Sequence, residues 1–398
     1  MVSVLMIMAD VAWWVVAMRF AKGRLWRVLV TVFMGVQLAV HVSFISGLVS
    51  PNHVPKVMLV AAMVWHYFAV VGLLPLGILC AYGWGRRRIA RVGEVRRDGC
   101  VETPGSANSQ TRREFISAAA ALVPPLFTVG MTGVALAQIN NLRLRRFTLS
   151  IPSLPRALDG ITLAHVTDIH VGMLTRARVM REMVNTVNAL RADLVLLTGD
   201  LIDYDLSDLF EGIALVRAME GRHGLWLIEG NHDVAVDGGE FERRVKAAGL
   251  PLLLDESAVT SVRGYPVQCF GLRWMPGIAR ARGGGLDVVT ASQMRLLMQG
   301  RQPEAFPILL SHHPHAFDAA VKADLPLTLA GHTHGGQFMF SGQLGLGPAL
   351  FRYWSGLYTR GRSQMIVSNG VGNVFPIRIQ APAEIVHITL RGAGAHVG

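Results

Sequence analysis

Long apolar stretches dominate the first third of the chain, and their lengths predict helices that cross a membrane. A helix needs about 20 consecutive apolar residues to span a bilayer core. Four stretches approach or exceed that length, and they comprise residues 3–20, 28–49, 57–84 and 115–138. We expect residues 1–84 to form about three transmembrane helices. Residues 115–138 are expected to form a fourth, kinked by Pro124 and Pro125.

Beyond residue 138 the pattern changes to short apolar strands that alternate with amphipathic helices. After a lead-in over residues 139–160, runs such as ITLAHV and DLVLLTG are typical of buried strands. Helical patterns separate the early strands over residues 175–190, 208–219 and 238–249. Shorter β runs follow. This order predicts an α/β sandwich of two sheets flanked by helices over residues 161–390, with a tail over 391–398.

Charge is unevenly distributed, and this distribution sets the expected topology. The 398 residues carry a net charge of +11, and 51% of them are hydrophobic. Residues 1–113 hold 13 of the 38 basic residues and 4 of the 27 acidic ones, so they carry +9 and the remainder only +2. Nucleic acid is therefore not an expected partner. Basic loops stay in the cytoplasm, so the Arg-rich connector over residues 85–114 predicts that everything after residue 138 lies outside.

The segment that starts at Thr111 also resembles a twin-arginine export signal. Arg112 and Arg113 precede an apolar run that ends in Ala-Leu-Ala. The segment is either a retained fourth transmembrane helix or a cleaved signal. Both alternatives place the C-terminal domain outside the cytoplasm.

Polar residues able to bind metal follow five of the predicted strands, after the runs LAHV, LLTG, LIEG, ILLS and TLAG. Open α/β sheets bind ligands at the carboxyl ends of their strands. The ten residues concerned are Asp168, His170, Asp200, Asp203, Asn231, His232, Asp233, His312, His332 and His334. His332 and His334 would face the same way in extended backbone. Carboxylate, amide and imidazole ligands without thiolate favour Mn, Fe, Zn or Ni.

Each of these residues also admits an ordinary structural role. Asp168 could cap the next helix, Asp203 could cap a helix or stand in a turn, and Asn231 could be a turn residue. The role of His313, which adjoins His312, stays open. Four further histidines lack a comparable setting and are expected to be structural or surface residues, namely His165, His223, His315 and His387.

Taken together, the ordered motifs D-x-H, G-D-x-x-D, G-N-H-D, S-H-x-P and G-H-x-H resemble those of the calcineurin-like metallophosphoesterase superfamily. The resemblance covers about residues 161–390, and the ordered set is highly specific. The finer resemblance is to a bacterial membrane-associated branch, through the C-terminal runs YWSGLYTRG, VSNGVG and PIRIQAPAEI. What these three runs do is not evident from the sequence.

The resemblance implies a metallophosphoesterase-type fold that holds two divalent or mixed-valence metal ions. It assigns one ion to Asp168, His170 and His334. It assigns the other ion to Asn231, His312 and His332. Asp200 would bridge the two, so that each histidine of the G-H-x-H motif serves a different ion.

The resemblance also implies a mechanism of phosphate-ester hydrolysis. A metal-bound hydroxide would attack phosphorus in line with the leaving group. His232, oriented by Asp233, would act as general acid towards the leaving alkoxide. Asp203 would hydrogen-bond a ligand from outside, and His313 is left out of the metal ligands because it occupies a variable position of its motif.

Three functions are compatible with these features. The leading one is a phosphoesterase in a bacterial inner membrane, multi-pass, with its catalytic domain on the outer, periplasmic side. Its substrate would be a phosphate mono- or diester, plausibly of an envelope lipid or a lipid-linked sugar phosphate. The alternative is a membrane sensor or scaffold that binds metal without catalysis, against which the intact pair His232 and Asp233 argues. A third is a bimetallic hydrolase of amides.

Overall fold

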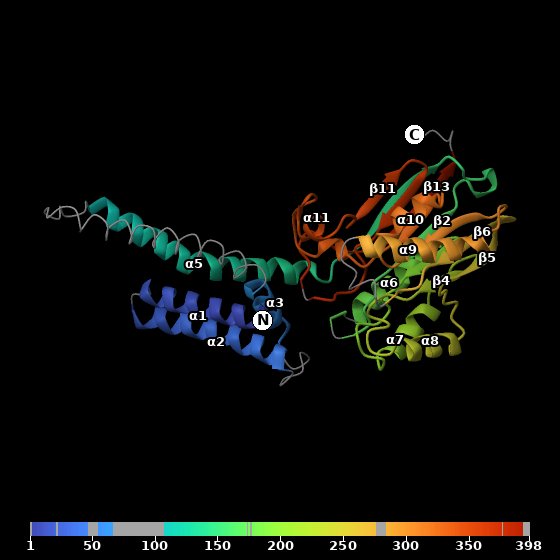
Figure 1. The fold of residues 1–398 in the computed structure, drawn as a ribbon. Coiled ribbons are helices and arrows are strands. Elements are labelled where there is room, and N and C mark those ends of the chain that lie inside the picture. Colours follow the sequence, from blue (N-terminus) through green and yellow to red (C-terminus); the bar gives the residue numbers. More distant parts are fainter. Residues whose placement is uncertain are drawn as a thin grey trace. The chain divides into compact units, whose positions relative to one another are not determined.

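The computed structural model of the chain consists of two compact units, which are Met1–Leu136 and Ala137–Gly398. The structure describes residues 2–20, 23–46, 55–66, 107–172, 174–175, 177–275, 284–375 and 377–392 (Figure 1). Residues 67–84 of the predicted third span, most of the basic connector and residues 393–398 of the predicted tail lie outside the described residues.

The described part of the first unit consists of apolar helices. These are α1 (Val2–Phe20), α2 (Arg24–Ser46), α3 (Lys56–Met63) and most of α5 (Ala107–Gln138). Trp13, Phe33 and Trp65 pack edge to face with ring centroids 4.8 to 6.1 Å apart. Asp10 is buried, accepts a hydrogen bond from Trp65 Nε1 and lies 2.8 Å from His66 Nε2. Its polar partners explain how an acid is accommodated in an apolar segment.

One stretch of the described helices, Arg24–Ser43, is long and apolar enough to cross a membrane. Shorter apolar stretches are Met6–Val15, Val57–His66 and Leu122–Gln138. Helix α5 continues through Pro124 and Pro125. The expectation of a membrane helix is therefore supported for one span, and further spans stay a prediction.

The second unit contains two sheets, as the alternation of strands and helices predicted. The first sheet has the order β1 (Leu142–Ile151), β13 (Ala383–Gly392), β2 (Thr162–Val166), β3 (Leu194–Thr198), β4 (Leu225–Ile228). The second has the order β11 (Gly356–Arg360), β12 (Ser363–Val367), β8 (Leu327–Ala330), β7 (Phe306–Leu310), β6 (Tyr265–Gly271), β5 (Glu256–Val262). Strands β9 (Met339–Ser341) and β10 (Leu344–Gly345) form a short hairpin.

Parallel strands in each sheet are connected by helices. Between β2 and β4 run α6 (Ala177–Leu190) and α7 (Leu209–Arg217), and α8 (Gly238–Ala247) follows β4. In the second sheet, α9 (Gly284–Leu297) and α10 (Ala316–Lys322) connect β6, β7 and β8. Helix α11 (Leu346–Leu350) lies between β10 and β11. The parallel arrangement brings the carboxyl ends of neighbouring strands to the same edge.

Apolar cores hold these layers together. Leu163 of the first sheet and Ile308 of the second belong to the core between the sheets. Met183 on α6 and Phe241 on α8 cover the outer face of the first sheet, and Phe317 on α10 covers the second (Figure 1). The predicted α/β sandwich of two sheets flanked by helices is confirmed.

Two element boundaries differ from the sequence prediction. The lead-in over residues 139–160 contributes the edge strand β1, which pairs in parallel with β13 about 240 residues later. The run PLLLDES (residues 251–257), whose composition predicts a strand, is divided: Leu252 forms an isolated bridge with Leu227, and Glu256 and Ser257 begin β5. Both differences arise from pairings that are distant in sequence, which local alternation of residue types does not reveal.

Candidate metal centre

All ten predicted site residues lie in loops that follow the carboxyl ends of parallel strands. Asp168 and His170 follow β2, and Asp200 and Asp203 follow β3. The segment Asn231–Asp233 follows β4. In the second sheet, His312 follows β7, while His332 and His334 follow β8. The core between the sheets thus fixes where five loops meet.

One group of ligand-competent atoms is formed by Asp168, His170 and His334, within 4.8 Å of one another. The two imidazole Nε2 atoms are 3.1 Å apart, and Asp168 Oδ1 lies 3.8 Å from His170 Nε2 and 3.4 Å from His334 Nε2. All three residues are buried. Facing nitrogens and a carboxylate at this spacing are suited to share one cation.

A second group is formed by Asp200, His312 and His332. His312 Nε2 lies 3.1 Å from Asp200 Oδ2 and 3.2 Å from His332 Nδ1. The amide oxygen of Asn231 lies 3.0 Å from the same His312 nitrogen. The side chains that the family resemblance assigns to one ion are therefore close together here.

Asp200 connects the two groups. Its Oδ2 atom is 3.5 Å from His170 Nε2 as well as 3.1 Å from His312 Nε2. Its Oδ1 atom accepts a hydrogen bond of 2.9 Å from the backbone N–H of His232. A third group, formed by His170, Asp200 and His232, overlaps the first two. One carboxylate thus faces histidines of both groups.

Backbone strain is concentrated at this site. Left-handed φ angles between 45° and 72° occur at five of its non-glycine residues, which are Asp168, His170, Asp200, His332 and His334. Such angles are costly for residues with a Cβ and persist where surrounding structure enforces them. Neighbouring glycines leave the required room, because a Cβ on Gly230 would lie 2.1 Å from Asp200 Oδ1 and one on Gly331 would lie 2.2 Å from Asp168 Oδ2.

The electrostatics of the site fit a bound cation. Burial opposes protonation of His170, but Asp168, Asp203 and Asp200 raise the pKa of its imidazole to about 10. Burial likewise opposes a charged His312, whose pKa Asp200 raises to about 9. The carboxylates therefore impose a strongly negative potential on buried imidazoles. With carboxylate, amide and imidazole donors, this chemistry fits Mn, Fe, Zn or Ni.

His232 and Asp233 do not form the expected pair. The carboxylate of Asp233 accepts hydrogen bonds from the backbone N–H groups of Ile202 and Gly230, at 3.0 and 2.9 Å. It is buried and turned towards the backbone of two loops. His232 Nδ1 instead lies 2.8 Å from the carbonyl oxygen of Asp203 and 3.2 Å from its Oδ1 atom. The prediction that Asp233 orients His232 is therefore corrected to Asp203.

Aromatic residues outside the ten predicted positions border the site. The Tyr204 ring packs on His232 with centroids 4.2 Å apart, and its hydroxyl is 3.5 Å from His232 Nε2. Trp274 lies 5.5 Å from His332 and 5.9 Å from His313 between ring centroids. Tyr204 directly follows the D-x-x-D stretch, which was the available signal. Trp274 begins a stretch, residues 274–285, whose glycines and aromatic residue fit a loop that walls the site.

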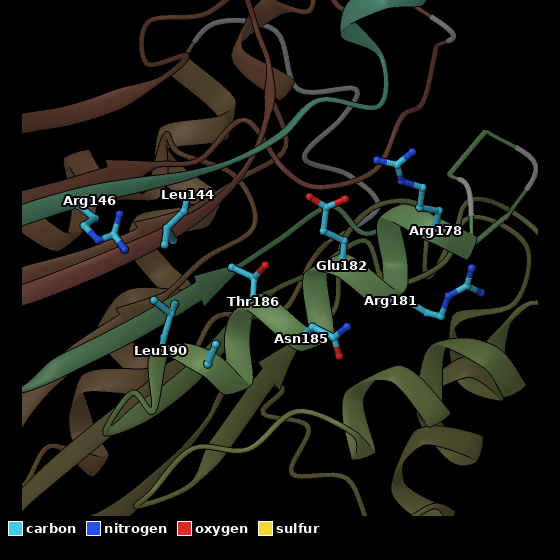
Figure 2. A pocket seen from close by; sticks show the side chains of 9 residues that line it. Leu144, Arg146, Arg178, Arg181, Glu182, Asn185, Thr186 and Leu190 are labelled. Carbon is cyan, nitrogen blue, oxygen red and sulfur yellow. The ribbon is translucent and has the colours of Figure 1, made fainter.

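A hollow elsewhere in the second unit is not lined by any of these metal-binding residues. It has a volume of about 580 Å³ and lies between β1 and α6 (Figure 2). Figure 2 shows Leu144 and Arg146 on one side and residues of α6 on the other. Its charged lining residues are Arg146, Arg178, Arg181 and Glu182. None of the predicted site residues lines it.

Strand-end loops that gather histidines and aspartates around a shared carboxylate define a metal-binding α/β domain. Residues 161–336 match the family described as calcineurin-like phosphoesterase. The second unit therefore contains a calcineurin-like phosphoesterase domain over these residues.

Curated relatives share this domain. The chain is 31% identical over 258 residues to a transmembrane protein with metallophosphoesterase domain from Danio rerio, covering 62% of this chain and 56% of the relative. It is 28% identical to the uncharacterized metallophosphoesterase YkuE of Bacillus subtilis, covering 61% and 84%. The chain thus spans little more than half the length of the first of these relatives. A solved structure of the sulfate thiohydrolase SoxB from Thermus thermophilus aligns with 62% of this chain and with 59% of its own chain. The sequence identity is 14% and the TM-score is 0.35.

Proposed function

We propose that this chain is a membrane-associated phosphoesterase that uses two metal ions to hydrolyse phosphate mono- or diesters. The observation that carries the proposal is the position of Asp200 between the two groups, 3.5 Å from His170 Nε2 and 3.1 Å from His312 Nε2. Two divalent ions bound in these groups would supply Lewis-acid activation of water and neutralise charge on the phosphoryl group.

In this proposal, some residues bind the metal ions and others donate the proton or orient its donor. Three residues, Asp168, His170 and His334, would hold one ion, and three others, Asn231, His312 and His332, would hold the second. Asp200 would bind both. His232, as an imidazolium protonated on both ring nitrogens, would give its Nε2 proton to the leaving alkoxide and keep the Nδ1 proton. Asp203 supports this role because its carbonyl oxygen and carboxylate both face His232 Nδ1 and fix the ring.

Association with a membrane is the second part of the proposal. The apolar stretch Arg24–Ser43 and the name of the Danio rerio relative support it. We propose a bacterial inner membrane with the domain on the outer side, and an envelope lipid or a lipid-linked sugar phosphate as substrate.

The test uses the full chain, purified in detergent and assayed with Mn²⁺ on bis-p-nitrophenyl phosphate and p-nitrophenyl phosphate. We expect about two ions per chain by metal analysis and turnover of at least one substrate. His223→Ala is the matched control, because His223 lies outside the three groups and should leave activity unchanged. A panel of phospholipids and lipid-linked sugar phosphates then separates the substrate classes.

Three results would contradict the proposal or one of its parts. A chain without bound metal would remove the basis of the centre. Two bound ions without turnover of any phosphate ester would favour the alternative of a non-catalytic sensor or scaffold. Recovery of the chain in the soluble fraction after cell lysis would contradict membrane association alone.

A further inference from the structure

Arg378, in the C-terminal run PIRIQAPAEI, is one of the largest fully buried side chains of the second unit. Its guanidinium forms no ion pair within 4.0 Å of a carboxylate among the described residues. A buried cation is costly unless its N–H groups are hydrogen-bonded, and an apolar residue would usually fill the space at lower cost. The position of this arginine therefore requires an explanation beyond packing.

The hydrogen bonds of Arg378 converge on one turn, with one further bond to the carbonyl oxygen of Ala381. Nε donates to Asn373 Oδ1 at 2.7 Å, and Nη1 donates to the carbonyl oxygens of Asn369 and Ala381 at 3.1 and 3.0 Å. Nη2 donates to the carbonyl oxygens of Gly370 and Gly372, and it lies 3.3 Å from His334 Nδ1. The planar fork thus fastens the turn over residues 369–373 and packs beside the ring of His334.

That turn in its own right supports the backbone of Asp168. Val371 N donates to the carbonyl oxygen of Thr167 at 3.0 Å, and Gly372 N donates to that of Asp168 at 2.6 Å. Gly370, at φ +72°, packs so closely that a Cβ would lie 2.6 Å from Asp168 Cβ. The backbone of the run VSNGVG therefore supports the strained loop that contains Asp168.

From these contacts we infer that Arg378 is a positioning residue for the metal group of Asp168, His170 and His334. It fastens the turn that holds Asp168 and packs beside the ring of His334, on the side opposite the ligand atoms. The other group has a separate support, since His312 Nδ1 lies 2.8 Å from the carbonyl oxygen of Thr198. This inference rests on the proposed function. It gives two of the C-terminal runs, VSNGVG and PIRIQAPAEI, a role in supporting the metal group.

Charge and position have opposite effects on metal binding, so the test must separate them. A guanidinium near the centre repels a cation, and removing it relieves that repulsion while also releasing the turn that supports Asp168. Arg378→Lys keeps the charge and loses the fork. Arg391→Lys is the matched control, because Arg391 pairs with Asp159 at 3.2 Å and, among the described residues, does not contact the centre.

The experiment titrates the full chain, stripped of metal by a chelator, with Mn²⁺ and records bound ions and electron paramagnetic resonance spectra. The wild type and Arg391→Lys should bind two ions that give a spin-coupled signal. In Arg378→Lys, one ion should bind about 10- to 100-fold more weakly, which is the usual effect of losing a partner of a metal ligand. At limiting Mn²⁺ the spectrum should change to that of an isolated ion.

Each outcome is decisive. Equal affinities in Arg378→Lys and wild type, or an equal weakening of both ions, would overturn the inference and leave the proposed function standing. A wild type that binds no Mn²⁺ would instead refute the proposed function. Should Arg378→Lys fail to fold, Asn373→Ala removes the acceptor of Nε with the cation retained and should weaken one ion selectively. Loss of fold in both variants would count against a local role.

Discussion

Asp203 faces His232 with two acceptors, since its Oδ1 atom is 3.2 Å and its carbonyl oxygen 2.8 Å from His232 Nδ1. We therefore assign a proton to Nδ1, which leaves Nε2 on the side of Tyr204. The Asp203 carboxylate also lies 3.6 Å from His170 Nδ1. One aspartate thus orients a proposed acid and a proposed metal ligand.

The first prediction concerns this pair. His232→Ala should lower kcat about 100- to 10,000-fold, which is the range for loss of a general acid, while both metal ions stay bound. Asp203→Asn keeps the carbonyl acceptor and should lower kcat about 10- to 100-fold. Rates on bis-p-nitrophenyl phosphate and metal content measure both effects. Loss of metal from His232→Ala would instead make His232 a ligand, consistent with the third group.

The second prediction concerns close packing at the strand ends. Gly230→Ala would place a Cβ 2.1 Å from Asp200 Oδ1 and 2.5 Å from the Asp200 backbone nitrogen, so the carboxylate must move. A displacement of about 1 Å in a catalytic group costs about 100-fold in rate, and we expect a loss of this size together with lower metal content. Gly342→Ala is the control because its Cβ meets nothing within 4 Å. Unchanged metal content in Gly230→Ala would contradict the geometry.

The sequence predicts where the site residues gather but not how they are held. Strand ends carry G-D and G-N-H-D, and the rule that parallel strands share a carboxyl edge brings these motifs together. His332 and His334 illustrate the limit, because they belong to different groups through left-handed backbone rather than through extended alternation. Which way Asp233 turns depends on backbone N–H groups of two other loops.

Supporting contacts over long sequence separations are equally hidden. Arg378 and His334 are 44 residues apart, and β1 pairs with a strand near the C-terminus. Neither contact leaves a local periodicity in the residue pattern. A residue that acts through a turn, as Arg378 does, becomes visible only when its hydrogen bonds are known.

The third prediction is a pH dependence of stability that arises from His165. Its ring is fully buried on β2, with Nε2 2.8 Å from Thr198 Oγ1, and burial lowers its pKa to about 3. The unfolded chain would titrate near 6.5, so between these values it binds a proton that the folded chain does not. The free energy of unfolding therefore falls as pH drops through this window.

His165→Gln removes this titration and keeps a hydrogen-bonding side chain. Urea unfolding at pH 7.5 and pH 5 should show a fall in unfolding free energy that is about 2 kcal/mol smaller for the variant than for the wild type. Measuring both proteins with chelator present removes the contribution of metal binding. An identical fall in unfolding free energy in both proteins would show that His165 does not cause this pH dependence.

The last prediction concerns Asp200, on which the two groups depend together. In Asp200→Asn the amide oxygen can still accept the hydrogen bond from His232 N, and the fold should be retained. The amide nitrogen would then replace Oδ2, which faces His312 Nε2 at 3.1 Å and His170 Nε2 at 3.5 Å. A neutral donor in that place offers no lone pair to either ion, so both should bind more than about 100-fold more weakly, beyond the usual effect of an outer contact. Metal analysis after gel filtration measures this, with circular dichroism as the control for folding. Retention of either ion at its wild-type affinity would mean that Asp200 serves one group only.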